Sequence, residues 1–162
     1  MKYYGKNSLS SVINVILSIV LILGIILSGY ILFFELPKVN ISGFHKYITI
    51  ALLIIGIIAT FAFVIELKRI IKTLVLENPF TASNVKSLRR LMFSCFTIAF
   101  CYIVNFVLNL GKDTFSIINI DQAGIHTDAE IFIFLLAGCF IGILSKVFEQ
   151  AVKYKEDNDL TI

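Results

Sequence analysis

Histidine and cysteine are the residue types in this sequence that could bind a metal or act in catalysis, and their positions favour neither role. His45 and His126 fall in segments between apolar blocks, where histidine is usually solvated. Cys95, Cys101 and Cys139 lie in apolar stretches and lack the close pairing of a zinc or redox motif. We therefore expect buried free thiols, with one bridge between helices as the open alternative, and neither a metal nor a cofactor.

No group of residues matches a known catalytic motif. The chain has no Gly-rich phosphate loop, no Gly-x-Ser-x-Gly elbow and no His-Glu-x-x-His helix. An intramembrane protease would need a Ser-His or Asp-Asp dyad within the bilayer, and the apolar segments contain neither. We therefore expect no catalytic residues and a protein that is not an enzyme.

Some polar side chains remain inside the apolar segments. Tyr102, Asn105 and Asn109 are spaced by three and four residues, so they share one face of a helix. They could line a small polar cavity, or the amides could form hydrogen bonds between helices. Asp, Glu, Lys and Arg, which usually mark proton relays and ion paths, are absent from the central part of each segment. Their absence argues against a pump or a coupled transporter.

Lys and Arg residues concentrate between the second and third apolar segments. They could bind anionic lipid headgroups or an acidic protein surface, or they could serve only to orient the chain in the membrane. No recognised nucleic-acid-binding motif accompanies them, so direct binding to nucleic acid is not expected. The cluster comprises Lys68, Arg69, Lys72, Lys86, Arg89 and Arg90.

Four apolar segments must position all these residues. Of 162 residues, 58% are hydrophobic and 15% are charged, whereas soluble domains contain about 25% charged residues. A membrane-spanning helix needs about 20 predominantly apolar residues. The last segment is shorter, but Lys146 can extend its stem to the headgroups and so lengthen the span. We expect one domain, residues 1–162, with helices at 9–34, 47–76, 82–110 and 129–155.

The distribution of positive charge predicts the orientation of these helices. Loops rich in Lys and Arg resist translocation and stay in the cytoplasm. With both termini inside, all 14 Lys and Arg residues except Lys38, Lys46 and Lys112 lie on the cytoplasmic side. The predicted fold is all-α: an integral membrane four-helix bundle, N-in and C-in, with a basic cytoplasmic helical hairpin between helices two and three.

Local patterns predict how the helices are joined and packed. Pro79 disfavours helical geometry in Asn78, and Thr81 can cap the next helix, so the chain should turn there. The alternating residues 114–120 predict a short hairpin or a segment lying on the membrane surface. Pairs of small residues predict close contact between helices, within one chain or in a homo-oligomer. The pairs are Gly24 with Ser28, Gly56 with Thr60, and Gly138 with Gly142.

Several of these positions carry a resemblance to a known family. The chain resembles the bacterial membrane protein family called domain of unknown function 2975. The resemblance implies a small four-helix protein of the bacterial plasma membrane, without an assigned activity, whose gene often neighbours that of a small helix-turn-helix regulator. The residues that carry it are Glu66-Leu67, Asn78-Pro79-Phe80-Thr81, Asn84, Leu88-Arg89, and the tail from Phe148-Glu149 to Leu160-Thr161-Ile162.

These observations lead to three hypotheses about function. Pro79, Phe80 and the tail fall on the predicted inner side, where they could dock a cytoplasmic protein such as a small transcriptional regulator. The same Pro79-Phe80 pair could instead only turn the chain. The alternatives are a small transporter or channel accessory subunit, and an immunity or stress-protection protein.

Overall fold

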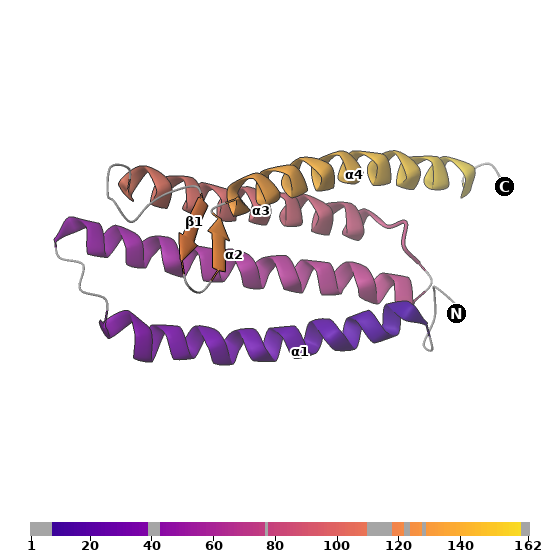
Figure 1. The fold of residues 1–162 in the computed structure, drawn as a ribbon. Helices are drawn as coiled ribbons and strands as arrows, with labels where there is room; N and C mark the ends of the chain where they lie inside the picture. Colours follow the sequence, from indigo (N-terminus) through magenta and orange to yellow (C-terminus); the bar gives the residue numbers. More distant parts are fainter. Residues whose placement is uncertain are drawn as a thin grey trace.

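Four long helices form most of the structure. The computed structural model describes residues 8–38, 43–76, 78–109, 118–121, 124–127 and 129–159. The helices run side by side in an up-and-down arrangement, and their order across the bundle follows their order in the chain (Figure 1). They are α1 (Leu9–Tyr30), α2 (Phe44–Val75), α3 (Ala82–Asn109) and α4 (Glu130–Asp159).

All four helices are long and apolar enough to cross a membrane, by length and composition. This confirms the helical, membrane-type fold predicted from the sequence. The orientation of the termini stays a prediction. Apart from helices, the described residues form one antiparallel hairpin, β1 (Ile118–Asp121) with β2 (Gly124–Thr127). Of the two predicted alternatives, the hairpin is therefore present, although residues 114–117 of the predicted run lie outside the described residues.

The first helix does not stay regular to residue 34 as predicted. After Tyr30 the chain continues as a π-helical turn, Ile31–Glu35, and then as a short 3-10 turn, Leu36–Lys38. Pro37 explains the change, because proline has no N–H to donate and its ring clashes with the carbonyl four residues earlier. A regular α-helix cannot continue through that position.

Helix α3 supplies most of the buried apolar residues of the bundle. It packs against α2 on one side and α4 on the other, whereas α1 packs against α2. Leu91, Cys95 and Ala99 of α3 are almost completely buried, and their spacing of four residues places them along one stripe of the helix. In α1, only Ser10 is buried among the described residues. The bundle is therefore tightest around α3 and loosest at α1.

Two glycines let α4 approach α3 closely. A Cβ atom at Gly138 would lie 2.8 Å from the ring of Phe96, and one at Gly142 would lie 2.9 Å from the sulfur of Met92. The predicted close contact at this pair is confirmed, and it occurs within one chain. The prediction is wrong for Gly56, where a Cβ would meet nothing within 4 Å, because Gly56 borders a cavity between the helices.

The prediction of buried thiols holds for two of the three cysteines. Cys95 and Cys101 are buried on α3, and Cys139 is exposed on α4. Cys139 follows Gly138, which faces α3, and successive residues of a helix point about 100° apart. Its side chain therefore points away from α3. All three thiols are free.

Candidate functional site at the basic end of the bundle

The predicted cluster of cationic residues gathers at one end of the bundle. We call the basic end the part formed by residues 66–76, 78–90 and 145–159. It contains the last turns of α2, the connection to α3, the first turns of α3 and the C-terminal part of α4. Helix α2 reaches Val75 because apolar residues continue at helical spacing after Ile65, with cationic residues between them.

Asn84 holds the connection between α2 and α3 in one shape. Its side chain is 1% exposed, and its amide donates hydrogen bonds of 2.6 Å to the Thr73 hydroxyl and to the Pro79 carbonyl oxygen. The Thr81 hydroxyl accepts a 3.3 Å hydrogen bond from the backbone N–H of Asn84, which confirms the predicted cap. The Asn-Pro-Phe-Thr turn is thus bound to both helices that it connects.

Helix α4 packs against this turn and its neighbours. The rings of Phe80 and Phe148 lie 5.5 Å apart, and Lys155 donates a 3.3 Å hydrogen bond to the Asn78 side chain. Phe80 nevertheless remains 45% exposed. The connection, α3 and α4 therefore form one continuous surface at the basic end.

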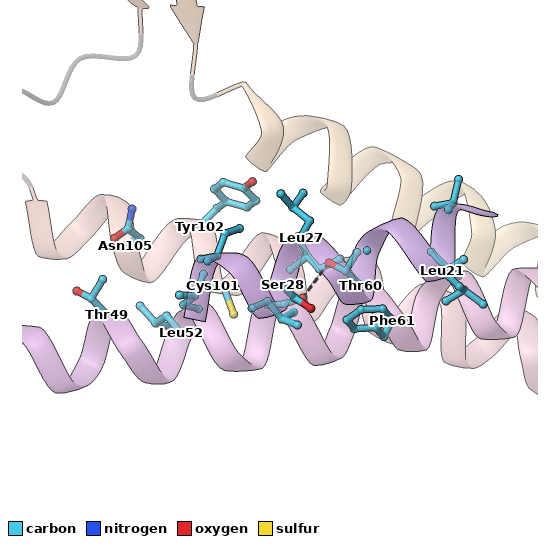
Figure 2. Close-up of a pocket in the computed structure, with 18 residues that line it drawn as sticks. Leu21, Leu27, Ser28, Thr49, Leu52, Thr60, Phe61, Cys101, Tyr102 and Asn105 are labelled. Carbon is cyan, nitrogen blue, oxygen red and sulfur yellow. Dashed lines mark hydrogen bonds between the residues drawn. The ribbon is translucent and has the colours of Figure 1, made fainter. Parts of the chain in front are cut away.

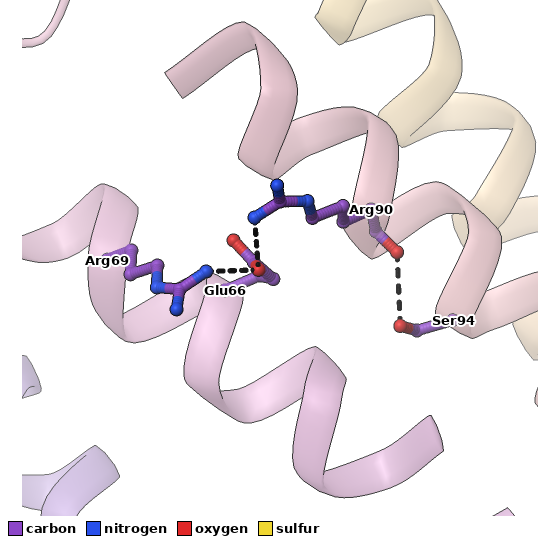
Figure 3. A network of polar contacts seen from close by, with 4 residues as sticks. All are labelled: Glu66, Arg69, Arg90 and Ser94. Carbon is purple, nitrogen blue, oxygen red and sulfur yellow. Dashed lines mark hydrogen bonds and ion pairs between the residues drawn. The ribbon is translucent and has the colours of Figure 1, made fainter. Parts of the chain in front are cut away.

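A buried carboxylate organises the cationic residues where α2 meets α3. Glu66 is 6% exposed and is the first charged residue after the apolar run 47–65 of α2. One of its oxygens accepts from Arg69 at 2.5 Å and from Arg90 of α3 at 3.1 Å (Figure 3). The two guanidinium groups remain largely exposed. Glu66 therefore links α2 to α3 and neutralises part of the cluster.

A second carboxylate links α3 to α4. Glu149 accepts a 2.6 Å hydrogen bond from Arg89 and a 3.1 Å hydrogen bond from Lys146. All three side chains are about half exposed or more, so this pairing contributes less to stability than a buried one. It does fix Arg89 against α4.

The six predicted cationic residues thus divide into two groups. Lys68, Arg69, Arg89 and Arg90 are held by Ser18, Glu66 or Glu149. Lys72 and Lys86 are exposed, and neither forms a hydrogen bond or ion pair with a described residue. The second group is more readily available to a ligand or partner. Sequence reasoning gave Glu66 and Glu149 no role, although Glu66 follows directly after an uncharged run of membrane length.

Replacing Glu66 by glutamine is expected to lower the free energy of unfolding by about 1–2 kcal/mol, because two charge-assisted hydrogen bonds are weakened. The partly exposed guanidinium groups keep the effect below that of a fully buried ion pair. Thermal unfolding in detergent measures it. Glu156→Gln, at an exposed position of α4, is the matched control. Equal stability of Glu66→Gln and the control would contradict the assigned role.

The predicted intramembrane polar face is divided in the structure. Tyr102 and Asn105 line a cavity of about 500 Å³ between α1, α2 and α3 (Figure 2). The Tyr102 ring also stacks on Phe134 of α4, with centroids 6.2 Å apart. Asn109 does not line the cavity and instead donates to the carbonyl and side-chain oxygens of Asn105, at 2.8 and 3.2 Å. These amide hydrogen bonds lie within α3.

Metal-binding residue types do not cluster in the described part of the chain. Among those residues, no group of three or more His, Cys, Asp or Glu side chains could hold a metal ion. His45 is exposed at the start of α2, and the side chain of His126 is not among those that the structure describes. The candidate site is therefore a surface with charged and aromatic side chains, together with a largely apolar cavity.

These features define the class of protein as a helical bundle with four potential membrane crossings and a polar, predominantly basic end. The chain belongs to the family described as Protein of unknown function (DUF2975), which matches residues 8–162. The family match confirms the resemblance carried by Glu66, the Asn78–Thr81 turn and the tail. No curated protein and no solved structure matches the chain.

Proposed function

We propose that this chain is a non-enzymatic multi-pass protein of the bacterial plasma membrane whose basic end binds a cytoplasmic protein. A small helix-turn-helix regulator, held at the membrane by this contact, is the candidate partner. The observation that carries the proposal is the length of α4. The helix continues without a break to Asp159, well past its uncharged run of residues 131–144.

The extension of α4 has the properties of a docking element. Tyr154 is 70% exposed, and Lys153, Lys155 and Glu156 around it are exposed as well. Tyrosine is enriched at protein–protein interfaces, and the rims of such interfaces are polar and solvent-accessible. The Lys155–Asn78 hydrogen bond and the Phe80–Phe148 contact hold the extension against the connection between α2 and α3. A partner would therefore meet a preformed surface, which reduces the entropy lost on binding.

The charge distribution supports a cytoplasmic position for this end. Nine Lys and Arg residues lie in the basic end, whereas the described residues of the opposite end include two, Lys38 and Lys46. Cationic loops are retained on the cytoplasmic side during insertion. Lys153 and Lys155 therefore belong both to the proposed partner surface and to the positive charge that predicts the orientation.

Site-specific photo-crosslinking tests the docking proposal. A photoreactive phenylalanine analogue replaces Tyr154 at the basic end or, as the matched control, Tyr47 at the other end, which is 74% exposed. We expect a cytoplasmic protein to be crosslinked in cells at position 154 and not at position 47, and mass spectrometry identifies it. Crosslinks to lipid alone at both positions would overturn the proposal.

Labelling of single cysteines tests the orientation separately. We expect a maleimide that cannot cross membranes to label His45→Cys in intact cells and to label Lys86→Cys only after lysis. Both positions are exposed in the structure, so a difference in labelling reports the side of the membrane. Cys139 is replaced by alanine in both variants, and the thiols of Cys95 and Cys101 are buried. Labelling of Lys86→Cys in intact cells would reverse the proposed orientation.

A further inference from the structure

The cavity between α1, α2 and α3 is a groove of mainly aliphatic and aromatic side chains that runs along the helices. On α2 it extends from Thr49 to Val64, a rise of about 22 Å, which is most of the roughly 30 Å hydrocarbon thickness of a bilayer. Its volume of about 500 Å³ lies in the range of small-molecule sites. Leu27, one of the lining residues, is 59% exposed. The groove is therefore open to the surrounding solvent, which for this protein is lipid.

The serine and threonine hydroxyls that border the groove are satisfied by their own helices. Ser28 donates to the Ile25 carbonyl oxygen, Thr49 to that of His45, and Thr60 to that of Gly56, at 2.9–3.0 Å. Hydroxyls bonded in this way need no polar ligand. The labelled side chains in Figure 2 show these few polar groups among Leu21, Leu27, Leu52 and Phe61. The groove thus suits a long apolar ligand.

A cation lies one helical turn beyond the end of the groove that faces the basic end. Lys68 lies four residues beyond Val64, so it continues the groove-lining face of α2 by one turn. Its ammonium group donates a 2.7 Å hydrogen bond to Ser18 of α1, which bridges the two helices. An ammonium group has three donors, so two remain for a ligand. Lys72, exposed one turn further on, adds a second positive charge.

We propose that this groove binds one acyl chain of an anionic glycerophospholipid, with the lipid phosphate on Lys68. The apolar length of the groove matches the chain, and the ammonium group at its end matches the phosphate. Lys68 follows the apolar run that ends at Ile65, so it lies where headgroups begin. The inference is independent of the proposed protein partner, because it concerns the groove and not the extension of α4.

Native mass spectrometry of the full chain in detergent, with added phosphatidylglycerol or phosphatidylcholine, tests the lipid proposal. We expect wild-type protein to retain phosphatidylglycerol preferentially. Lys68→Gln should reduce that preference about fivefold, which corresponds to about 1 kcal/mol for one cation near anionic lipid. The matched control is Lys153→Gln, which removes an exposed cation of α4, a helix that does not line the groove. Equal preference in both variants would overturn the proposal.

Filling the groove tests the position of the acyl chain. Gly56→Leu and Thr60→Phe place side chains in the cavity and should each reduce bound lipid of both kinds at least fivefold. Gly29→Leu is the control, because Gly29 does not line the cavity and has open space around it. If Gly56→Leu fails to fold, Thr60→Phe, at an exposed position, supplies the same test. Unchanged lipid retention would overturn the proposal. So would a disulfide-linked dimer of a Gly56→Cys variant, because it would show that a second copy of the chain occupies the groove.

Discussion

Replacing Gly138 by leucine is expected to lower the free energy of unfolding by about 3 kcal/mol, at the upper end of the range for overpacking. Even the first added atom would lie 2.8 to 3.2 Å from three atoms of the Phe96 ring. Phe96 is only partly exposed, so moving its ring away from the added atoms would disturb the packing of α3 against α4. The added side chain must therefore push α4 away from α3, and the contact between these helices is lost along several turns.

The buried cysteines supply a direct readout of this change. A maleimide that becomes fluorescent on reaction with thiols reports heating-induced exposure of Cys95, which is 0% exposed in the folded protein. Cys139 is replaced by alanine to remove the exposed thiol. Gly29→Leu is the control, since a Cβ at Gly29 meets nothing within 4 Å. If both leucine variants unfold at the wild-type temperature, the close packing of α3 and α4 is not as described.

Asn84→Ala should destabilise the protein by about 2–3 kcal/mol, because two hydrogen bonds of a buried amide are lost together. The Pro79 carbonyl oxygen and the Thr73 hydroxyl lose this partner. The variant should also loosen the turn locally, so the amide hydrogens of residues 78–85 should exchange faster with solvent. Hydrogen exchange measured by mass spectrometry separates this local effect from a global loss of stability.

Ser83→Ala is the control for the turn, because Ser83 is exposed and adjacent to Asn84. Asn84→Asp adds a second comparison. Aspartate has nearly the same size but provides no N–H donors, and its carboxylate would be buried, so it should destabilise the protein at least as much as alanine if the donated hydrogen bonds matter. Stability close to wild type in Asn84→Asp would show that the shape of the side chain, and not its donors, holds the turn.

Much of the fold could be predicted from the sequence, because a bilayer imposes a simple length requirement. An uncharged run of about 20 residues has few structures open to it in lipid other than a helix. The runs at Leu9–Phe34 and Leu91–Leu110 therefore identify α1 and α3 directly. The turn at Pro79 and the cap at Thr81 were equally local signals. The change of helix type after Tyr30 was missed, although Pro37 was visible and its effect extends one turn backwards.

Less of the candidate site could be predicted, because its contacts join residues distant in sequence. Spacing along α2 places Glu66 beside Arg69, but only the packing of α3 brings Arg90 to the same carboxylate. The pairing of Arg89 with Glu149 depends in the same way on how α4 lies against α3. The cluster of Lys and Arg is visible in the sequence, but the pairing of Glu66 and Glu149 with its members is not.

The small-residue pairs show the same limit. Gly138 and Gly142 pack against α3, whereas Gly56 borders a groove, although the sequence pattern is similar in both cases. A glycine has no side chain, so it leaves space on its face of the helix. The glycine itself does not determine whether a neighbouring side chain fills that space. The neighbouring helix decides between close contact and a cavity.

The uneven tightness of the bundle also implies an order in which the protein is built. Ribosomes synthesise α1, the loosest helix, first, and both α1 and α2 are complete before α3, which carries most of the buried apolar residues. Until α3 is made, Glu66 can pair with Arg69 of its own helix but not with Arg90 of α3. A nascent chain arrested at this stage lacks its strongest interhelical contacts. We therefore expect the bundle to gain most of its packing when α3 and α4 are added, and less when α1 and α2 first meet.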